Sequence, residues 1–517
     1  MPYISKRSSI RRKFNRRHSN KKRSIGSKKT RRIGKGSKHK RYLGQSRSRY
    51  HRPNRRKQKR QTKRRGGDKL SVTRQQALTS QLAPGQQNFL KKLCPNNNEC
   101  FSLGKYTSLT NAYFDDMSFG LAVDPITYVS RGQNGMVQSI RHEKQGYIAT
   151  SLLKMSLEQT SDNLLYEYLV GLFINKHIKS FPCFLQTFAA YKYKSDDLHN
   201  KATSLTSGGM TVAELASSIE PLYTYGQKIT DELIERMLKT SCIDSHRICL
   251  STQYFENART LHSMFASPTK FFITTDLLQM LLQIYIPLGL METSFTHNDL
   301  KADNVLVYTI PNNQYVTMHY DTPRGRVTLK TRYICKIIDY GRCYFKDAQM
   351  TSETVTQTLC KYSECAPNCG KQKGYTFFDD NLSSYNMSGT VNNPGKDLWL
   401  AQSIKGQLFM IPYTYAELAE IFRSSKWINI VNSVPYEQSN YGVNYPREKR
   451  ELEDSPGKII SVSSFANKLI DFFLSDQASI DAYHRLEFED TPNGPSIKYG
   501  TMIIDATKIG SEYTLEV

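Results

Sequence analysis

The feature that most constrains this chain is the segregation of its charge. Residues 1–67 contain 29 of the 72 Lys and Arg residues and no Asp or Glu. Like charges repel one another, and this segment has little apolar surface to bury, so we expect it to be a disordered polycationic tail. The other 450 residues carry 43 basic and 46 acidic side chains and are nearly neutral. A folded core must therefore be built from the chain that follows the tail.

The composition after the tail is that of a globular protein. Hydrophobic residues make up 38% of the whole chain, and most of its aromatic residues are Tyr and Phe, which is enough to fill a core. The ten Cys show no paired spacing and no signal segment precedes them, so we expect reduced thiols. The most apolar run, Leu277–Met291, is too short to span a membrane. We therefore expect no membrane partner.

The hydrophobic patterns alternate in type along the chain. Apolar runs bounded by turn residues predict strands, and apolar residues at helical spacing after a capping residue predict helices. Strands followed mostly by helices indicate an α+β fold in two lobes. The expected strands are 146–156, 181–193 and 247–255, with a hairpin of 315–320 and 327–339; the expected helices are 162–178 begun by Asp162, 274–294 begun by Thr274 or Thr275, and 396–404.

Two short segments carry the residues of a chemical site. In "FTHNDLKADNVLV" (295–307), Asp299 and Asn304 flank a loop that leads into a strand, and in "KIIDYG" (336–341) Asp339 follows another apolar strand. One carboxylate can orient a nucleophile, while the second, with the Asn amide oxygen, can hold Mg²⁺ against phosphate oxygens. Lys301 can neutralise a transferring phosphoryl group. The pattern predicts phosphoryl transfer.

These segments resemble the catalytic loop and the Asp-Phe-Gly segment of the eukaryotic-type protein kinase superfamily. Upstream, "SRGQNGMV" (130–137) resembles the Gly-rich loop, with Gly132, Gly135 and Val137 in register. Stretches such as "YEYLVG" and "CAPNCG" are similar to serine/threonine protein kinases of large (giant) DNA viruses. The resemblance covers about residues 129–400. It implies a β-rich N-lobe, a mainly helical C-lobe, and ATP with Mg²⁺ bound between them.

The resemblance also implies roles for single residues. Asp299 would accept or orient the proton of a Ser or Thr hydroxyl on a protein substrate, and Lys301 would assist it. Asn304 and Asp339 would hold the metal. The "DLK" of residues 299–301 is typical of serine/threonine rather than tyrosine kinases.

Four further positions follow from the same resemblance. Lys154 would hold the α- and β-phosphates of ATP, with Glu167 as its ion-pair partner. Glu256 would lie in the hinge near the adenine. Asp397 matches a buried Asp in the helix after the activation segment.

The sequence departs from the family pattern in three places. Asn298 replaces the Arg before the catalytic Asp, so we expect activity without phosphorylation of the activation segment. About 35 residues separate Asn304 from Asp339, because a hairpin has been added. No Ala-Pro-Glu triplet ends the activation segment.

This interpretation divides the chain into five parts. They are the tail 1–67, a lead-in 68–108, the N-lobe 109–257, the C-lobe 258–480 and a C-terminal extension 481–517. The N-lobe contains a polar, partly helical insertion at about 195–245, and the C-lobe contains the hairpin insertion at about 308–335.

Two other functions fit parts of the pattern. A small-molecule kinase of the aminoglycoside or choline type shares the spacing of His297, Asp299 and Asn304, but Gly341 and the Gly-rich loop favour a protein kinase. A catalytically inactive kinase-like virion or nucleic-acid packaging protein would not need Lys154 and Asp339. Neither the substrate nor the oligomeric state follows from the sequence.

The tail and the cysteines leave alternatives open. A tail of this charge density is expected to bind nucleic acid or another polyanion through its phosphates, although a solubilising or import segment has a similar composition. The resemblance implies a place in the host cytoplasm or nucleus, or packaging in the virion. Cys360, Cys365 and Cys369, with Cys343 as a fourth ligand, have a spacing loosely suited to Zn²⁺ or are free thiols in a loop.

Overall fold

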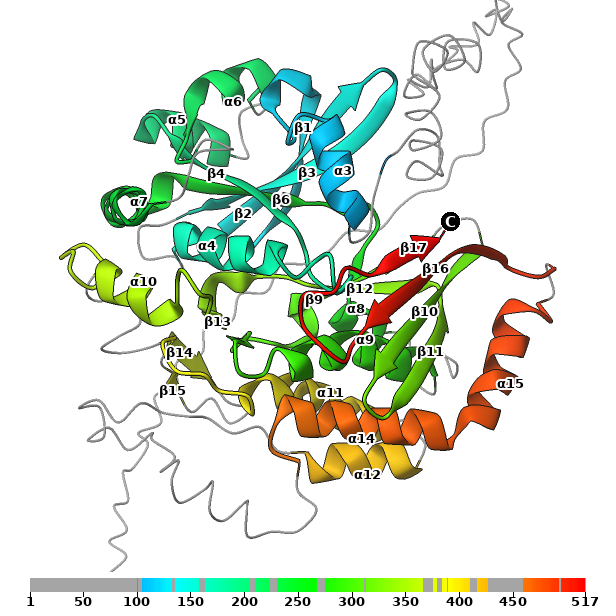
Figure 1. The fold of residues 1–517 in the computed structure, drawn as a ribbon. Helices are drawn as coiled ribbons and strands as arrows, with labels where there is room; N and C mark the ends of the chain where they lie inside the picture. Colours follow the sequence, from blue (N-terminus) through cyan, green and yellow to red (C-terminus); the bar gives the residue numbers. More distant parts are fainter. Residues whose placement is uncertain are drawn as a thin grey trace, which may run out of the picture. The chain divides into compact units, whose positions relative to one another are not determined.

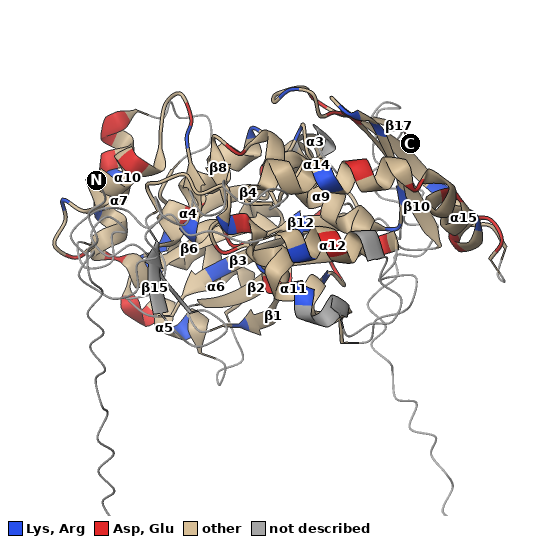
Figure 2. Cartoon of the chain, turned by 90° about the horizontal axis from the view of Figure 1, so that it is seen from below, with Lys and Arg blue, Asp and Glu red and all other residues tan. Residues whose placement is uncertain are grey.

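The computed structural model describes part of the chain after the tail, and all of these residues belong to the unit 67–517. The predicted disorder of residues 1–67 lies outside the described residues. Lys and Arg are interspersed with Asp and Glu over the described elements (Figure 2). The described residues are 100, 105–132, 135–157, 163–204, 210–223, 230–266, 275–310, 313–365, 375–378, 384–387, 389–409, 416–425, 459–491 and 494–516.

The first half of the described chain is built on a six-stranded sheet with the strand order β1-β2-β3-β6-β4-β5 (Figure 1). Neighbouring strands are antiparallel. The alternating burial along β3 places every second side chain in the core, as its sequence predicts. The strands are β1 Ala122–Arg131, β2 Gly135–Lys144, β3 Tyr147–Ser156, β4 Thr187–Tyr193, β5 Ile219–Pro221 and β6 Ile248–Gln253.

Helices pack around this sheet. The helix α4 is shorter than the expected 162–178 and is begun by Asn163 rather than Asp162, because the Asn163 side chain caps it by accepting from the backbone N–H groups of Leu165 and Tyr166. Within its described residues, the predicted insertion contains three helices and the short strand β5. The helices are α3 Lys105–Tyr113, α4 Leu164–Asn175, α5 Asp196–Thr203, α6 Val212–Ser218 and α7 Asp231–Ile243.

The second half of the described chain combines longer helices with several small sheets, so it is less helical than expected. Its central helix α9 spans Leu277–Leu290 and continues without a break from π-helical residues 275–276. The chain is therefore already helical at Thr275, one of the two predicted starts, while Thr274 lies outside the described residues. The buried residues of α9 pack against α14. The helices are α8 Leu261–Met264, α9 Leu277–Leu290, α10 Ser352–Leu359, α11 Trp399–Phe409, α12 Ala416–Ser424, α14 Val462–Ser475 and α15 Gln477–Phe488.

The predicted hairpin differs from expectation in its second arm. The run 327–339 divides into two strands that belong to different sheets, because the chain turns at Arg332. β10 (Gln314–Thr322) pairs with β11 (Gly325–Thr331), whereas β12 (Tyr333–Ile337) pairs with β9 (Val305–Thr309). The β9 and β12 pair is the one that positions the candidate site.

The C-terminal segment completes the sheet that the hairpin begins. β16 (Ile497–Asp505) pairs in parallel with β10, and β17 (Thr514–Glu516) pairs antiparallel with β16 (Figure 1). The helix α15 crosses the boundary expected at residue 480. The remaining strands are β7 Arg259–Thr260, β8 Phe295–Thr296, β13 Tyr344–Phe345, β14 Tyr375–Phe378 and β15 Ser384–Met387.

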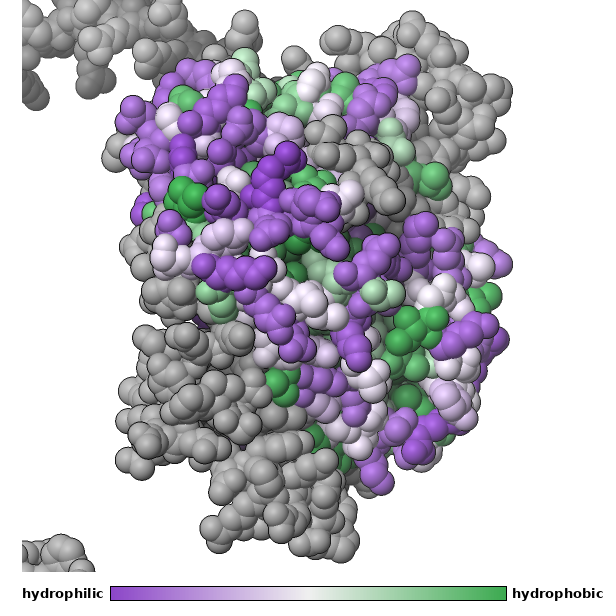
Figure 3. Space-filling model, turned by 60° about the vertical axis from the view of Figure 1, so that its left-hand side comes forward, coloured by the Kyte–Doolittle hydropathy of each residue, from purple (hydrophilic) through white to green (hydrophobic). Residues whose placement is uncertain are grey.

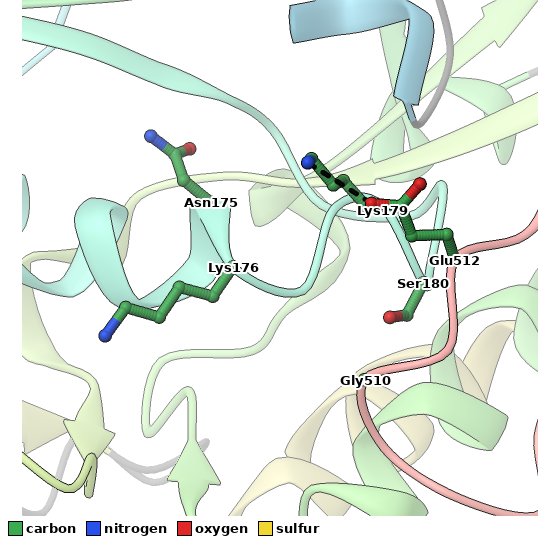
Figure 4. A pocket seen from close by; sticks show the side chains of 6 residues that line it. All are labelled: Asn175, Lys176, Lys179, Ser180, Gly510 and Glu512. Carbon is green, nitrogen blue, oxygen red and sulfur yellow. Dashed lines mark ion pairs between the residues drawn. The ribbon is translucent and has the colours of Figure 1, made fainter.

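The chain that leads into β17 also contacts the end of α4. The backbone N–H of Tyr513 donates to Lys179 O at 2.9 Å, and Lys179 Nζ lies 3.2 Å from Glu512 Oε1. A hollow of about 440 Å³ lies beside this contact (Figure 4). Both lysines that line it are paired, since Lys176 forms an ion pair with Asp347.

Two cysteines are joined, which contradicts the expectation of reduced thiols. Cys242 in α7 forms a disulfide with Cys365, just after α10, with 5.1 Å between their Cα atoms. Cys360 is also disulfide-bonded, while Cys343 is a buried free thiol. A disulfide sulfur is not a thiolate ligand, so this cluster does not form the zinc site that the spacing allowed. Cys369 lies outside the described residues.

The helices and the surface were compared with those expected of a membrane-spanning chain. No helix of the described residues is long and apolar enough to cross a membrane. The face shown in Figure 3 is mostly hydrophilic, with small separate apolar patches. Most of the large apolar side chains of the described residues are buried in the core.

Candidate active site

A partly buried ion-pair cluster joins three elements of the fold. Lys154 on β3 places its Nζ 2.7 Å from Glu167 Oε2 and 2.7 Å from Asp339 Oδ1. Glu167 stands in the first turn of α4 and is 4% exposed. Asp339 follows β12 with a left-handed backbone (φ 69°). The structure thus brings together a lysine and two carboxylates that are up to 185 residues apart in sequence.

These charges stabilise one another. Burial disfavours the charged form of Lys154, but the carboxylates of Asp339 and Glu167 outweigh it and raise the pKa of Lys154. The charge of Lys154 lowers the pKa of Asp339 to about 2, against the opposing effect of burial. Lys154 and Asp339 therefore both remain charged at neutral pH.

The loop 297–304 holds Asp299 in place. Asn304 Nδ2 donates to Asp299 O at 2.8 Å and lies 3.3 Å from Asp299 Oδ2. Lys301 Nζ lies 3.4 Å from the same Oδ2. The backbone N–H of Ile338 donates to Asn304 O at 3.1 Å, which ties this loop to the strand end that carries Asp339.

A buried carboxylate holds the backbone of the same loop through hydrogen bonds. Asp397, 2% exposed, accepts from the backbone N–H groups of His297 (2.7 Å) and Asn298 (2.9 Å). Burial raises the pKa of Asp397, and the two backbone hydrogen bonds from His297 and Asn298 oppose that rise. His297 Nε2 lies 2.9 Å from Ile338 O. Asp397 therefore positions the backbone immediately before Asp299.

Asn298, which stands where the resemblance predicts an Arg, makes a structural contact. Its Nδ2 donates to Arg342 O at 3.0 Å, and its backbone is left-handed (φ 64°), which Asn tolerates better than most residues. A neutral amide cannot form an ion pair with a phosphate. Activity without phosphorylation of the activation segment stays a prediction.

Tyr340 and Lys396 contribute contacts that the sequence interpretation missed. The buried Tyr340 hydroxyl accepts from Leu185 N (2.9 Å) and donates to Ile337 O (2.8 Å), which anchors the strand end before Asp339. Lys396 is 1% exposed and lies 4.7 Å from the Trp399 ring centre. Burial lowers its pKa to about 7, although Asp299 opposes that shift. The sequence contained one signal for the Tyr340 contacts: position 340 is Tyr where the family pattern has Phe, and a buried hydroxyl needs hydrogen-bond partners.

The Gly-rich stretch 130–137 runs from the end of β1 into the start of β2. A Cβ at Gly135 would lie 2.7 Å from Met155 O, so a side chain there would push β2 away from β3. Gly132 N donates to Gly135 O at 2.8 Å. Val137 pairs with Lys154 across the two strands. Residues 133–134 of this stretch lie outside the described chain.

Glu256 is the candidate that stands apart. It is exposed between β6 and β7. Within the part of the chain that the structure describes, no hydrogen bond or ion pair joins it to the other candidate residues. Its neighbour Phe255 is buried and packs 5.3 Å from the Tyr308 ring.

The oxygen atoms of the site suit a magnesium ion. Mg²⁺ prefers carboxylate and amide oxygens, which Asp339 and Asn304 provide. Because Asn304 uses its amide nitrogen to hold Asp299, its amide oxygen is left to act as a ligand. The residues present therefore fit the metal that the sequence predicts.

Comparison with known proteins adds little to this geometry. No protein-family model and no curated protein sequence matches the chain. Among solved structures, the chain is similar to a crystal structure of a Plasmodium kinase domain, with 15% identity over 46% of this chain and a TM-score of 0.22. The match spans 60% of that chain. A TM-score of this size does not establish a shared fold.

Proposed function

We propose that this chain is an ATP- and Mg²⁺-dependent protein kinase that phosphorylates Ser and Thr hydroxyls. The observation that carries the proposal is the cluster of Lys154, Glu167 and Asp339, tied through Ile338 to the loop of Asp299. Lys154 is held between two carboxylates, and the neighbouring loop 297–304 carries the further carboxylate of Asp299. Together these groups supply the charges that phosphoryl transfer needs.

Each residue has a role in this proposal. Lys154 holds the α- and β-phosphates, and Glu167 keeps its ammonium group in place. Asp299 orients the acceptor hydroxyl and takes its proton, while Lys301 neutralises charge on the transferred group. Asn304 and Asp339 would hold Mg²⁺, which would neutralise phosphate charge.

Removing the acidic groups should test these roles. We expect Asp299→Asn and Asp339→Asn each to reduce transfer of radiolabelled phosphate from ATP by about 10²-fold or more, since positioning or metal charge is lost. Asp303→Asn is the matched control, because Asp303 is exposed in the same loop and should keep wild-type transfer. Near wild-type transfer in either site variant would refute the assignment.

The acceptor in the same assay separates the alternatives. Label on a protein supports the protein kinase, and label only on aminoglycosides or choline supports the small-molecule kinase. Absence of transfer to every acceptor, with the fold intact, supports the inactive packaging protein. The proposal is supported over the small-molecule kinase by the Gly-rich stretch, since β2 and β3 are so close at Gly135 that a Cβ there would lie 2.7 Å from Met155 O.

We also propose that residues 1–67 bind nucleic acid or another polyanion. The support is the charge of this segment alone, 29 basic residues without an acidic one. Phosphate contacts of this kind depend on charge and little on base sequence.

A further inference from the structure

A second pocket lies on α4, away from the residues proposed for catalysis. It has a volume of about 430 Å³ and is formed by α3 and the turn after it, α4, β4 and β5. We call it the α3–α4 pocket. Its walls combine amide, carboxylate and aromatic side chains, and the residues that define its chemistry are Asn111, Asp116, Tyr168, Gln186, Tyr191 and Tyr223.

Two amide oxygens in this pocket lack hydrogen-bond donors. Gln186 is 7% exposed, and its Oε1 has no partner among the residues that the structure describes. The same holds for Asn111 Oδ1, while Asn111 Nδ2 donates to Asp116. A buried acceptor without a donor costs free energy. Both atoms therefore call for a ligand that brings N–H or O–H donors.

The pocket also holds a carboxylate that is not neutralised. Asp116 makes no ion pair with any described residue, whereas its neighbour Asp115 is bonded to Lys144 Nζ at 3.2 Å. Burial, and then the charge of Asp115, raises the pKa of Asp116. A positive ligand would stabilise this carboxylate.

The aromatic walls narrow the choice of cation. Tyr168, Tyr191 and Tyr223 line the pocket together with the apolar Leu172 and Pro221. Planar guanidinium groups stack on aromatic faces and offer five donors in a fixed fork, whereas an ammonium is a compact, strongly hydrated charge. Apolar walls suit the aliphatic stem of an arginine side chain.

We propose that the α3–α4 pocket binds a guanidinium group, such as the arginine side chain of a peptide segment. Asp116 provides the opposite charge, and Gln186 and Asn111 accept the remaining N–H donors. The helix α4, which contributes Tyr168 and Leu172 to the pocket, also carries Glu167. Binding would thus restrain α4, whose Glu167 forms an ion pair with Lys154 on β3.

Calorimetric titration of the full-length protein tests the proposal. The probes are acetyl-Gly-Arg-Gly-amide, its citrulline analogue, which has the same shape without the charge, and agmatine. We expect the arginine peptide to bind at least about 10-fold more tightly than the citrulline peptide. Tighter binding of the peptide than of agmatine identifies a protein segment as the source, and the reverse order identifies a free small molecule.

Substitutions locate the binding. Gln186→Leu and Asp116→Asn should each weaken arginine binding about 10-fold, and Asp197→Asn, an exposed acid on α5, should not. Gln186→Leu removes an oxygen that has no partner among the described residues, so its thermal unfolding temperature should be no lower than that of wild type. Equal binding of both peptides, or unchanged binding in both pocket variants, overturns the proposal.

Hydrogen exchange provides a second readout. The arginine peptide should slow exchange in α3 and α4, and protection confined to other elements would also overturn the proposal. Neither measurement uses catalysis. A failure of the α3–α4 pocket is therefore distinguishable from a failure of the proposed kinase activity.

Discussion

At the residue scale, Asp276 beside α9 is a buried acid outside the candidate active site. It is 6% exposed, and its Oδ1 accepts from the Tyr483 hydroxyl at 2.6 Å. Burial raises its pKa to about 7, and the hydrogen bond from Tyr483 only partly opposes this rise. An ordinary Asp titrates near pH 3.9, so Asp276 is protonated in the folded chain over a pH range where the unfolded chain has released the proton.

The sign of the resulting pH dependence follows from this difference. Between about pH 4 and pH 7 the folded state binds more protons than the unfolded state, so stability falls as the pH rises. Asp276→Asn keeps a hydrogen-bond acceptor and removes the titration. We expect urea unfolding of this variant to lack a fall on the order of 3 kcal/mol that wild type shows across this window.

The control for this prediction lies on the neighbouring helix. Asp481→Asn changes an exposed acid of α15 and should keep the wild-type dependence of stability on pH. Identical pH profiles for Asp276→Asn and wild type would show that Asp276 titrates normally.

At the element scale, the contact between α4 and β4 sets the position of Glu167. A Cβ at Gly171 would lie 2.6 Å from Thr187 Cβ, so no side chain fits between this helix and the sheet. Gly171→Ala should push α4 outward and lower stability by about 1–3 kcal/mol. Glu167, one turn earlier on the same helix, would move with it and weaken its contact with Lys154.

A compensating substitution tests this explanation. Thr187→Ala removes two of the three Thr187 atoms that a Cβ at Gly171 would meet, Oγ1 and Cγ2, and keeps Cβ. The double variant Gly171→Ala, Thr187→Ala should regain part of the lost stability in chemical denaturation. A single variant as stable as wild type would mean that α4 does not need this close approach.

At the scale of the whole molecule, the Cys242–Cys365 disulfide joins the insertion to the segment after α10 across 123 residues. Closing a loop of this length restricts the unfolded chain, and typical stabilisation is about 2–5 kcal/mol. We expect the free energy of unfolding of the double variant Cys242→Ser, Cys365→Ser, measured in urea, to be lower than that of wild type by about 2–5 kcal/mol. Because Cys100 and Cys360 are also disulfide-bonded, reductant should still affect the variant, but less than wild type.

The tail makes a separate prediction at this scale. Binding of the full chain to DNA or RNA should weaken steeply as salt rises and should depend little on base sequence, because phosphate contacts release counterions. Deleting residues 1–67 should abolish this binding, since the remaining chain is nearly neutral. A deletion variant that binds DNA as tightly as the full chain, measured by salt-titrated fluorescence anisotropy, would contradict the assignment.

The sequence by itself determined the local elements and the candidate residues. The alternation in β3 and the capped, apolar run of α4 reflect local backbone and burial rules, which act over a few residues. The placement of Asp299, Asn304 and Asp339 at strand ends was visible for the same reason. The segregated charge likewise shows where the core cannot be, without any knowledge of the fold.

Tertiary structure decided how distant residues meet. The contact of Lys154 with Asp339, the pairing of β16 with β10 and the bond between Cys242 and Cys365 all join residues more than 100 positions apart. Local patterns do not encode such pairings, because the free energy that selects them comes from packing of the whole core. The division of 327–339 between two sheets has the same cause: each half is an equally good strand, and only its neighbours determine which sheet it joins.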